Sequence, residues 1–258
     1  MNRLEGKVAI VTGAGRGIGR GIALAYAREG AKVAVVSRTA ATVDEVVDQI
    51  RAEGGEALGV TCDVGHADQI AAMIDRTVAT FGTVDILVNN AQGFGTEAKP
   101  TGTPDFIDLE VFPEDEWEYT MRTGPTATLR AMKGVFPYMK DGGGKIINFG
   151  SRRGQIGHAK TLAYNCAKEA IRALTRTAAR EWGPYGINVN VINPLVMSNS
   201  LKTFNEQGHK GALDQVPLRR YGDPEKDAGG LAIFLASSES DYLTGMTFML
   251  DGGFYMSP

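Results

Sequence analysis

The sequence has no long apolar run and almost no cysteine. No uninterrupted apolar stretch reaches about 18 residues, so we expect no helix that spans a membrane. The first residues, Met1 to Lys7, lack the apolar core of a signal peptide. Cys62 and Cys166 lie far apart without C-x-x-C spacing, which argues against a disulfide framework and a zinc site. These features predict a cytoplasmic protein with two buried free thiols.

An excess of positive charge is also absent. Lysine and arginine number 27 against 30 aspartate and glutamate, which gives a formal net charge of -3 and a pI near 5.7. Such a chain offers no basic field to nucleic acid or to an anionic membrane surface. The three histidines, His66, His158 and His209, form no metal-ligand pattern with acids. We therefore expect no nucleic acid, no membrane and no metal as a partner.

The sequence does contain a repeated alternation of apolar runs and amphipathic stretches. The runs predict seven strands, at residues 8–11, 33–36, 58–60, 84–88, 145–149, 187–192 and 246–250. They are nearly continuous, as in parallel strands buried on both faces. Helices are predicted at residues 17–29, 42–53, 66–81, 114–139, 160–182 and 224–236. This order predicts an α/β fold, a Rossmann-type doubly wound parallel sheet with helices on both faces and ligands at the carboxyl ends of the strands.

No linker or internal repeat divides the chain, so residues 1–258 are expected to form a single domain. Two long connections interrupt the alternation, at residues 93–116 and 195–223. The first holds seven acids, three prolines and one lysine. Because loops of this length in a compact domain are usually functional, we expect both to bound the substrate.

A glycine-rich turn follows the first predicted strand. Its residues are Thr12, Gly13, Ala14, Gly15, Arg16, Gly17, Ile18 and Gly19. Glycines let the backbone approach a phosphate, and the helix that follows offers free N–H groups and partial positive charge. The turn predicts a dinucleotide site, although Ile18 stands where the usual G-x-G-x-x-G spacing has its last glycine. The alternative is a tight turn with a purely structural role.

The end of the second strand bears on which dinucleotide is bound. An acid there would hold the ribose 2′-hydroxyl of NAD, whereas a basic residue accommodates the 2′-phosphate of NADP. The strand ends with Ser37 and Arg38, and the next acid is Asp44. Arg38 and Arg16 can both meet a phosphate. The pattern favours NADP(H) over the alternative of two solvent-exposed arginines.

Tyr164 and Lys168 lie four residues apart in a predicted helix, so they share one face. A neighbouring cation stabilises a phenolate and lowers the pKa of the phenol, which makes tyrosine a usable acid and base. Taken alone, such a pair is more often a surface contact.

Other motifs accompany the pair at the ends of predicted strands. They are Asp63, Asn89-Asn90-Ala91, Ser151 thirteen residues before Tyr164, Asn193-Pro194, and the closing Asp251-Gly252-Gly253. Together with the glycine turn, they closely resemble the classical short-chain dehydrogenase/reductase family over essentially the whole chain.

The resemblance implies roles for individual residues. Tyr164 resembles the proton donor to a carbonyl oxygen, Ser151 the hydroxyl that orients it, and Lys168 the residue that lowers the tyrosine pKa and holds the nicotinamide ribose. The implied cofactor contacts are Gly13, Gly15, Arg16, Gly17, Ile18, Gly19, Ser37, Arg38, Asp63, Val64, Asn90, Ala91, Pro194 and Val196, together with Tyr164 and Lys168. The resemblance also implies a homotetramer, with residues 114–139 and 160–182 at one interface and the C-terminal segment near another.

The sequence departs from the family pattern at several positions. Met121 stands where the family commonly has an asparagine that holds a water linked to the lysine, and a thioether cannot donate a hydrogen bond. Gln92 and Leu195 replace glycines, so they either shape the substrate pocket or are tolerated loop substitutions.

Arg152, Arg153 and His158 lie between Ser151 and Tyr164. The arginines are suited to a substrate carboxylate or phosphate. The favoured interpretation is that they pair with the acids of residues 93–116, since charged residues near loops are mostly solvated or paired. For His158, a solvent-facing or hydrogen-bonded ring is favoured over a proton shuttle.

The leading functional hypothesis is interconversion of a ketone and a secondary alcohol with NADP(H). The alternatives are a non-redox enzyme on the same scaffold, such as an epimerase, dehydratase or lyase, and a cofactor-binding protein that has lost turnover. Fold does not separate these, because function belongs to the site.

Overall fold

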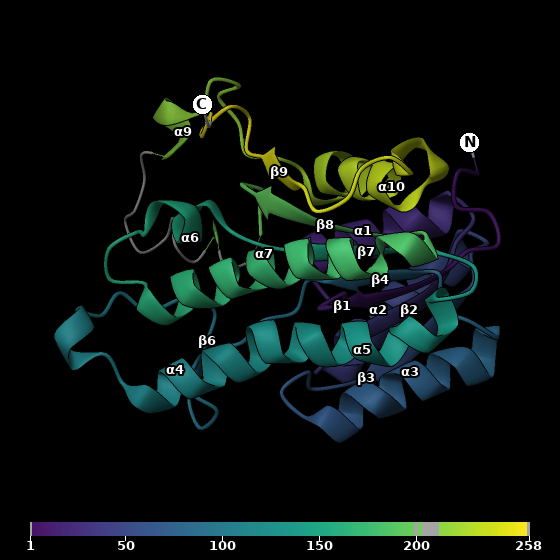
Figure 1. Ribbon diagram of the computed structural model, residues 1–258, viewed down its shortest axis with the longest axis horizontal. Coiled ribbons are helices and arrows are strands. Elements are labelled where there is room, and N and C mark those ends of the chain that lie inside the picture. Colours follow the sequence, from purple (N-terminus) through teal and green to yellow (C-terminus); the bar gives the residue numbers. More distant parts are fainter. Residues whose placement is uncertain (1, 199–200, 203–211, 257–258) are drawn as a thin grey trace.

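Seven parallel strands form the central sheet of the computed structural model, which describes residues 2–198, 201–202 and 212–256 (Figure 1). The strands are β1 (Val8–Thr12), β2 (Lys32–Ser37), β3 (Ala57–Thr61), β4 (Ile86–Asn89), β7 (Gly144–Phe149), β8 (Ile187–Pro194) and β9 (Thr247–Leu250). Their order across the sheet is β3-β2-β1-β4-β7-β8-β9. All seven predicted strands are confirmed. The order changes direction between β1 and β4, the place where a doubly wound sheet binds its ligand.

Helices cover both faces of this sheet, as predicted (Figure 1). One face carries α1 (Gly17–Arg28), α2 (Ala40–Ala52) and α10 (Gly230–Ala236), and the other carries α3 (Ala67–Phe81), α5 (Ala127–Met139) and α7 (Leu162–Trp182). Successive side chains of a strand point to opposite faces. Accordingly Ala9 and Val11 of β1 join the core under α1, whereas Ile10 joins the core under α3.

Two predicted helices contain a π-helical segment. The helix predicted at 114–139 consists of α4 (Glu114–Met121), η2 (Arg122–Thr126) and α5, and Pro125 lies inside η2. Proline has no N–H to donate, so the regular hydrogen-bond ladder cannot pass through it. The helix predicted at 224–236 begins with η4 (Pro224–Gly229) before α10.

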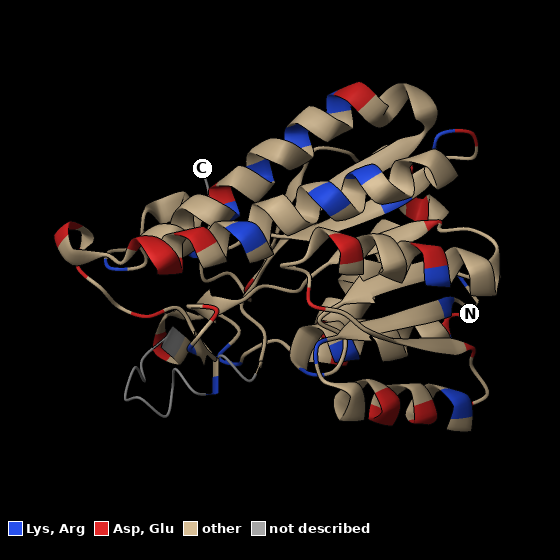
Figure 2. Cartoon of the chain, turned by 90° about the horizontal axis from the view of Figure 1, so that it is seen from below, with Lys and Arg blue, Asp and Glu red and all other residues tan. Residues whose placement is uncertain are grey.

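Several short elements fall in segments predicted as loops. They are the hairpin of β5 (Phe94–Gly95) and β6 (Pro100–Thr101), α6 (Arg152–Ile156), α9 (Ala212–Gln215), and the 3-10 turns η1 (Leu109–Val111), η3 (Gly183–Tyr185) and η5 (Ser238–Ser240). The acidic positions of residues 93–116 are spread along the segment before α4 and over the first turn of that helix (Figure 2). Of the second long connection, residues 199–200 and 203–211 lie outside the described residues.

The two cysteines differ in their exposure to solvent. Cys62 is buried as expected, but Cys166 is partly exposed, because its position on α7 lies between the buried face and solvent. In the described ranges no helix is long and apolar enough to cross a membrane. The same ranges contain no cluster of three or more potential metal ligands.

Helix α1 is held against η4 at close range. A Cβ at Gly21 would lie 2.7 Å from the Glu225 backbone nitrogen and would overlap the Pro224 carbonyl. One helical turn further, the Tyr26 hydroxyl donates a hydrogen bond of 3.0 Å to the Ala232 carbonyl. These contacts fix the helix whose first turn follows the glycine-rich loop.

Gly21→Ala should therefore destabilise the protein. The added methyl group forces the backbones of α1 and η4 apart, and overpacking of this kind costs about 1–3 kcal/mol. Gly230→Ala is the matched control, since nothing lies within 4 Å of a Cβ at that helical position, and alanine favours the helix. Urea unfolding of both variants measures the difference. Equal stability of the two would contradict the described packing.

Candidate active site

A cavity of about 740 Å³ opens where the strands end at their carboxyl side. Most residues singled out from the sequence line it: Gly13, Arg16, Gly17, Ile18, Ser37, Arg38, Asp63, Val64, Asn90, Ala91, Ser151, Tyr164, Lys168, Pro194 and Val196. Gly15 and Gly19 are buried and are not among the lining residues. The parallel sheet thus brings together residues that are far apart in sequence, at the edge where the prediction placed them.

Hydrogen bonds between the ends of β1 and β4 shape one wall of the cavity. The Thr12 hydroxyl accepts from the backbone nitrogens of Asn90 (3.0 Å) and Ala91 (3.1 Å), and it donates to the Val88 carbonyl (3.1 Å). The Asn90 amide group donates to the Thr12 carbonyl at 2.9 Å. Asn90 therefore anchors the glycine turn to the neighbouring strand.

The glycine turn is packed too tightly for side chains. Gly13 has φ +68°, and a Cβ there would lie 2.7 Å from the Asn90 Nδ2 atom. At Gly19 a Cβ would overlap the Gly13 carbonyl. With Gly13 and Gly17 on the cavity wall, bare backbone and the start of α1 face the space. This cradle fits the pyrophosphate of a dinucleotide.

Arg38 and Arg16 lie at the same end of the cavity. Arg38 donates a hydrogen bond of 2.9 Å to the Tyr119 hydroxyl, and its Nη1 atom is 3.8 Å from the Asp63 carboxylate. Arg16 is exposed at the cavity edge. Arg38 is 46% exposed, so its guanidinium remains accessible from the cavity. Tyr119, on α4, escaped the sequence analysis because no local motif marks it.

The Tyr164 phenol lies in the first turn of α7 and hydrogen-bonds with Ser151. Ser151 caps the short helix α6, and its hydroxyl also accepts from the Arg153 backbone nitrogen at 3.2 Å. The Phe94 ring packs edge-on against Tyr164, with 5.7 Å between the ring centroids. Phe94 belongs to the unpredicted hairpin, and it lines the cavity beside the phenol.

Lys168 lies one turn further along α7 and is buried, with 6% of its surface exposed. Its ammonium donates a hydrogen bond of 2.9 Å to the Phe149 carbonyl and is 5.6 Å from the centre of the Tyr164 ring. Burial lowers the pKa of Lys168 to about 7, because the charged form loses hydration.

The pKa of Tyr164 differs from the sequence-based expectation. Burial raises the pKa of the phenol, and the Ser151 hydrogen bond and the Arg153 charge only partly oppose this. Lys168 does not lower it, for a physical reason: an amine with a pKa of about 7 has lost its charge before a phenol begins to ionise. In the free protein burial therefore favours the neutral form of the Tyr164 phenol.

The departures from the family pattern occupy different places. Met121, at the end of α4, does not line the cavity, whereas Thr123 does. Leu195 and Gln92 both line it. Both polar atoms of the Gln92 amide are buried without a hydrogen-bond partner among the described residues. The amide packs close to Gly124, so Gln92 shapes the interior of the cavity.

Arg152, Arg153 and His158 line the cavity as well. The Arg152 guanidinium stacks over the Phe254 ring at 4.0 Å, and that of Arg153 lies over Phe106 at 5.3 Å. The favoured pairing with acids of residues 93–116 is wrong for Arg152, which forms no ion pair within 4.0 Å in the described ranges. The stacking partner, Phe254, is remote in sequence.

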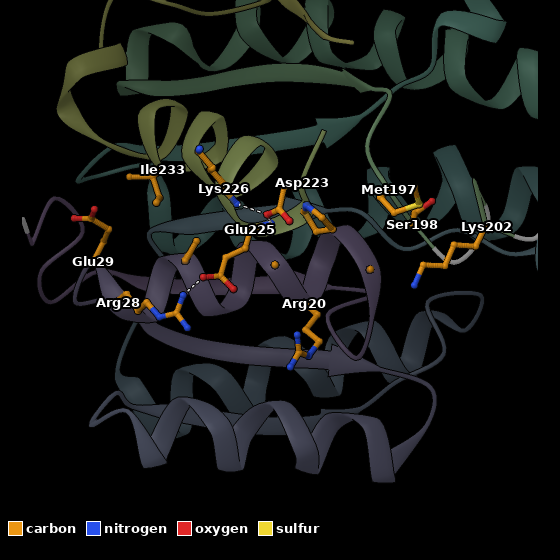
Figure 3. A pocket seen from close by; sticks show the side chains of 14 residues that line it. Arg20, Arg28, Glu29, Met197, Ser198, Lys202, Asp223, Glu225, Lys226 and Ile233 are labelled. Carbon is orange, nitrogen blue, oxygen red and sulfur yellow. Dashed lines mark hydrogen bonds and ion pairs between the residues drawn. The ribbon is translucent and has the colours of Figure 1, made fainter. Parts of the chain in front are cut away.

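A second cavity of about 700 Å³ lies between α1 and η4 (Figure 3). Its charged groups largely satisfy one another: Arg28 pairs with Glu225, and the Asp223 carboxylate accepts from the backbone nitrogens of Glu225 and Lys226. No tyrosine is among the described residues that line it. The first cavity is therefore the candidate active site.

Lys168→Met should change how stability depends on pH. The lysine pKa is about 7 in the folded state against an ordinary value of 10.5. Between pH 7 and pH 10.5 Lys168 is therefore protonated in the unfolded chain and neutral in the folded protein. The free-energy cost of burying the charged lysine is fully present below pH 7 and disappears as pH rises toward 10.5. The free energy of unfolding of wild type relative to Lys168→Met should rise by up to about 1.4 kcal/mol per pH unit.

Urea unfolding at about pH 7 and pH 9 measures this difference, with Lys140→Met, at an exposed position, as the control. The control should show no comparable pH dependence. A Lys168→Met difference that stays constant between the two pH values would contradict a lowered lysine pKa.

Comparisons with known proteins agree with this geometry. A family model described as Enoyl-(Acyl carrier protein) reductase matches residues 13–255. The chain is 36% identical to a 12alpha-hydroxysteroid dehydrogenase of Clostridium sp., with 100% of both chains covered. A solved 7 alpha-hydroxysteroid dehydrogenase, complexed with NADH and 7-oxo glycochenodeoxycholic acid, shares 31% identity with a TM-score of 0.87, covering 98% of this chain and 95% of that one.

A short-chain type dehydrogenase/reductase from Mycobacterium marinum has a TM-score of 0.88 and 32% identity, covering 99% of this chain and 98% of that chain. Matches of this extent include the glycine turn, the Tyr164–Lys168 helix and the whole sheet. The chain belongs to the short-chain dehydrogenase/reductase family of oxidoreductases, whose members use nicotinamide cofactors.

Proposed function

We propose that this protein interconverts a ketone and a secondary alcohol with NADP(H). The observation that carries the proposal is the convergence of Ser151, Tyr164 and Lys168 with the glycine turn in one cavity. A hydroxyl, a phenol and an amine next to a dinucleotide cradle supply what carbonyl reduction needs from the protein, namely orientation and a proton. The 7-oxo compound bound in a solved relative supports a ketone as substrate.

In this proposal Tyr164 gives its proton to the carbonyl oxygen during reduction and takes it back during oxidation. A nicotinamide cofactor, when bound, would provide the hydride transfer that the side chains of the protein cannot supply. Ser151, which hydrogen-bonds with Tyr164, orients the same oxygen. The raised pKa of Tyr164 keeps its proton in place until the carbonyl oxygen becomes basic. Lys168 holds the cofactor ribose and adds positive charge when protonated.

The proposed cofactor site extends from the glycine turn to the end of β8. Gly13, Gly17 and Ile18 would face the pyrophosphate, with Gly15 and Gly19 buried behind them in the same turn. Asp63 and Val64 would contact adenine, Asn90 and Ala91 would back a ribose, and Pro194 and Val196 would lie along the nicotinamide. NADP(H) is proposed over NAD(H) because Ser37 and Arg38 at the end of β2 and Arg16 before α1 line the cavity, so that a 2′-phosphate there would meet two guanidinium groups.

We also propose that the chain acts as a single domain in a homotetramer. Exposed apolar side chains support the two interfaces: Leu129 and Tyr138 on α5, and Tyr242 and Met246 near the C-terminal strand. A non-redox reaction with retained cofactor, or binding without turnover, would use the same cavity. An assay of a panel of ketones and alcohols, in which nicotinamide absorbance reports oxidation or reduction of the cofactor, separates these two alternatives from the proposed oxidoreductase activity.

Tyr164→Phe should abolish turnover while the protein still binds cofactor. The change removes the transferable proton and keeps the ring that packs on Phe94. Loss of a general acid lowers kcat by about 10²–10⁴-fold. Ketone reduction and NADPH fluorescence titration measure the two properties. Near-normal turnover of any good substrate would exclude Tyr164 as the proton donor.

Arg38→Asp should reverse the cofactor preference. Loss of a charge-assisted contact weakens NADPH binding by about ten- to a hundredfold, while a carboxylate at this place favours the 2′-hydroxyl of NADH. Fluorescence titration with each nucleotide measures both constants. Arg20→Asp on α1, which makes the same charge change outside this cavity, is the control. Equal binding of NADPH and NADH by the wild type would contradict the NADP(H) assignment.

A further inference from the structure

Asn193 lies at the carboxyl end of β8, and its side chain contacts the segment that carries Ser151. Only 1% of Asn193 is exposed, and the residue belongs to the lining of the cavity. Its Nδ2 atom donates a hydrogen bond of 2.6 Å to the Gln155 Oε1 atom of α6 and lies 3.6 Å from the Met249 sulfur. Its Oδ1 atom has no hydrogen-bond partner among the described residues. The hydrogen bond to Gln155 is therefore the shortest polar contact of this buried amide.

The same amide also contacts the residue directly before Ser151. A Cβ at Gly150 would overlap the Asn193 Oδ1 atom, so the amide fills the space that a side chain at position 150 would need. The Gly150 backbone nitrogen donates a hydrogen bond of 3.0 Å to the Ile192 carbonyl of β8. Asn193 thus contacts the chain on both sides of Ser151, at Gly150 before it and at Gln155 four residues after it.

The short helix α6 depends on contacts of this kind for its position. Its five residues are capped by the Ser151 hydroxyl, which accepts from the Arg153 backbone nitrogen at 3.2 Å. Because so short a helix is not stable alone, packing against its neighbours determines where it lies. The Asn165 carbonyl of α7 is 3.0 Å from the position of a Cβ at Gly154, and the Gln155 hydrogen bond adds the contact to β8. Loss of the second contact would let α6 and its capping hydroxyl move.

Small movements of Ser151 matter because its hydroxyl acts through position. It hydrogen-bonds with Tyr164 and thereby lowers the pKa of the phenol. In the proposed function it also orients the carbonyl oxygen, and a displacement of about 1 Å at such a group can lower the rate about a hundredfold. Gln155 is not among the described residues that line the cavity. It can therefore affect the reaction through the segment it holds, without touching a ligand there.

We propose that the hydrogen bond between Asn193 and Gln155 positions the Ser151 hydroxyl against Tyr164. Gln155 is the positioning residue on α6, and Asn193 is its anchor on the sheet. The inference rests on the proposed function for its effect on turnover. Its effect on the hydrogen bond between Ser151 and Tyr164 requires no substrate.

Gln155→Leu tests the proposal, because leucine is of similar size and cannot accept the hydrogen bond. With a ketone that the wild type reduces, kcat should fall about tenfold or more, while the Kd for NADPH stays within about twofold of the wild-type value. Gln49→Leu on α2 is the matched control, since Gln49 is also partly buried and hydrogen-bonded, accepting from Arg20 and donating to Glu53.

The control should keep the wild-type kcat and the wild-type Kd for NADPH. A Gln155→Leu variant with unchanged kcat would overturn the proposal. An equal fall in kcat for Gln49→Leu would also overturn it, because the effect would then follow from the loss of any side-chain hydrogen bond.

Ultraviolet difference titration of the free protein measures the second effect, with Tyr164→Phe as the reference that identifies the phenol. Ser151→Ala removes a hydrogen bond that lowers the pKa of Tyr164, so this pKa should rise. Gln155→Leu should raise the same pKa, and Gln49→Leu should leave it unchanged. Adding Gln155→Leu to Ser151→Ala should cause no further rise, because both changes remove one interaction.

This titration separates the inference from the proposed function. A rise in the Tyr164 pKa that Gln155→Leu causes only when Ser151 is present supports the positioning role even if no ketone is reduced. A pKa that Ser151→Ala raises and Gln155→Leu leaves unchanged overturns it. So does an equal rise in the Ser151→Ala background, since Gln155 would then act on Tyr164 without the serine. A pKa that Ser151→Ala itself leaves unchanged overturns it as well.

Discussion

The burial of Lys168 beside Tyr164 is the constraint on which the candidate site depends. A lysine held on the Phe149 carbonyl with a pKa of about 7 carries its charge only near or below neutrality. The neighbouring phenol, raised in pKa by the same burial, keeps its proton. Under the proposed function, this neutral phenol would serve the free protein as the proton donor for reduction. For alcohol oxidation, the Tyr164 phenolate would need a positive charge other than that of Lys168 to stabilise it. Arg153 is one such charge, because it lowers the pKa of Tyr164.

The sheet determines which groups can meet there. Parallel strands end at one edge, so β1, β4, β7 and β8 deliver the glycine turn, Asn90, Ser151 and Pro194 to a common space. The Thr12–Asn90 hydrogen bonds tie two of these strand ends together. The remaining walls come from segments outside the sheet: the hairpin with Phe94, helix α6 with its arginines, and Phe254 near the C-terminus. The sheet positions the glycine turn, Asn90, Ser151 and Pro194, and the segments outside the sheet determine the remaining shape and charge of the cavity.

Much of the fold could be predicted because the strands are buried on both faces and are therefore almost continuously apolar. The Tyr164–Lys168 spacing and the glycine turn are also local signals. What escaped prediction depends on contacts between distant segments. The stacking of Arg152 on Phe254, the exposure of Cys166 and the hydrogen bond between Arg38 and Tyr119 have no local pattern. The direction of the Tyr164 pKa was mispredicted because spacing reveals a neighbouring lysine but not how far burial removes its charge.

An ultraviolet difference titration of the wild type against Tyr164→Phe tests the central claim most directly, because it reads the ionisation of one phenol without any substrate. The account predicts that Tyr164 ionises above the ordinary tyrosine pKa of about 10 in the free protein, and at distinctly lower pH when NADP⁺ brings positive charge into the cavity. A Tyr164 pKa below the ordinary value in the free protein, or one that NADP⁺ leaves unchanged, would contradict it.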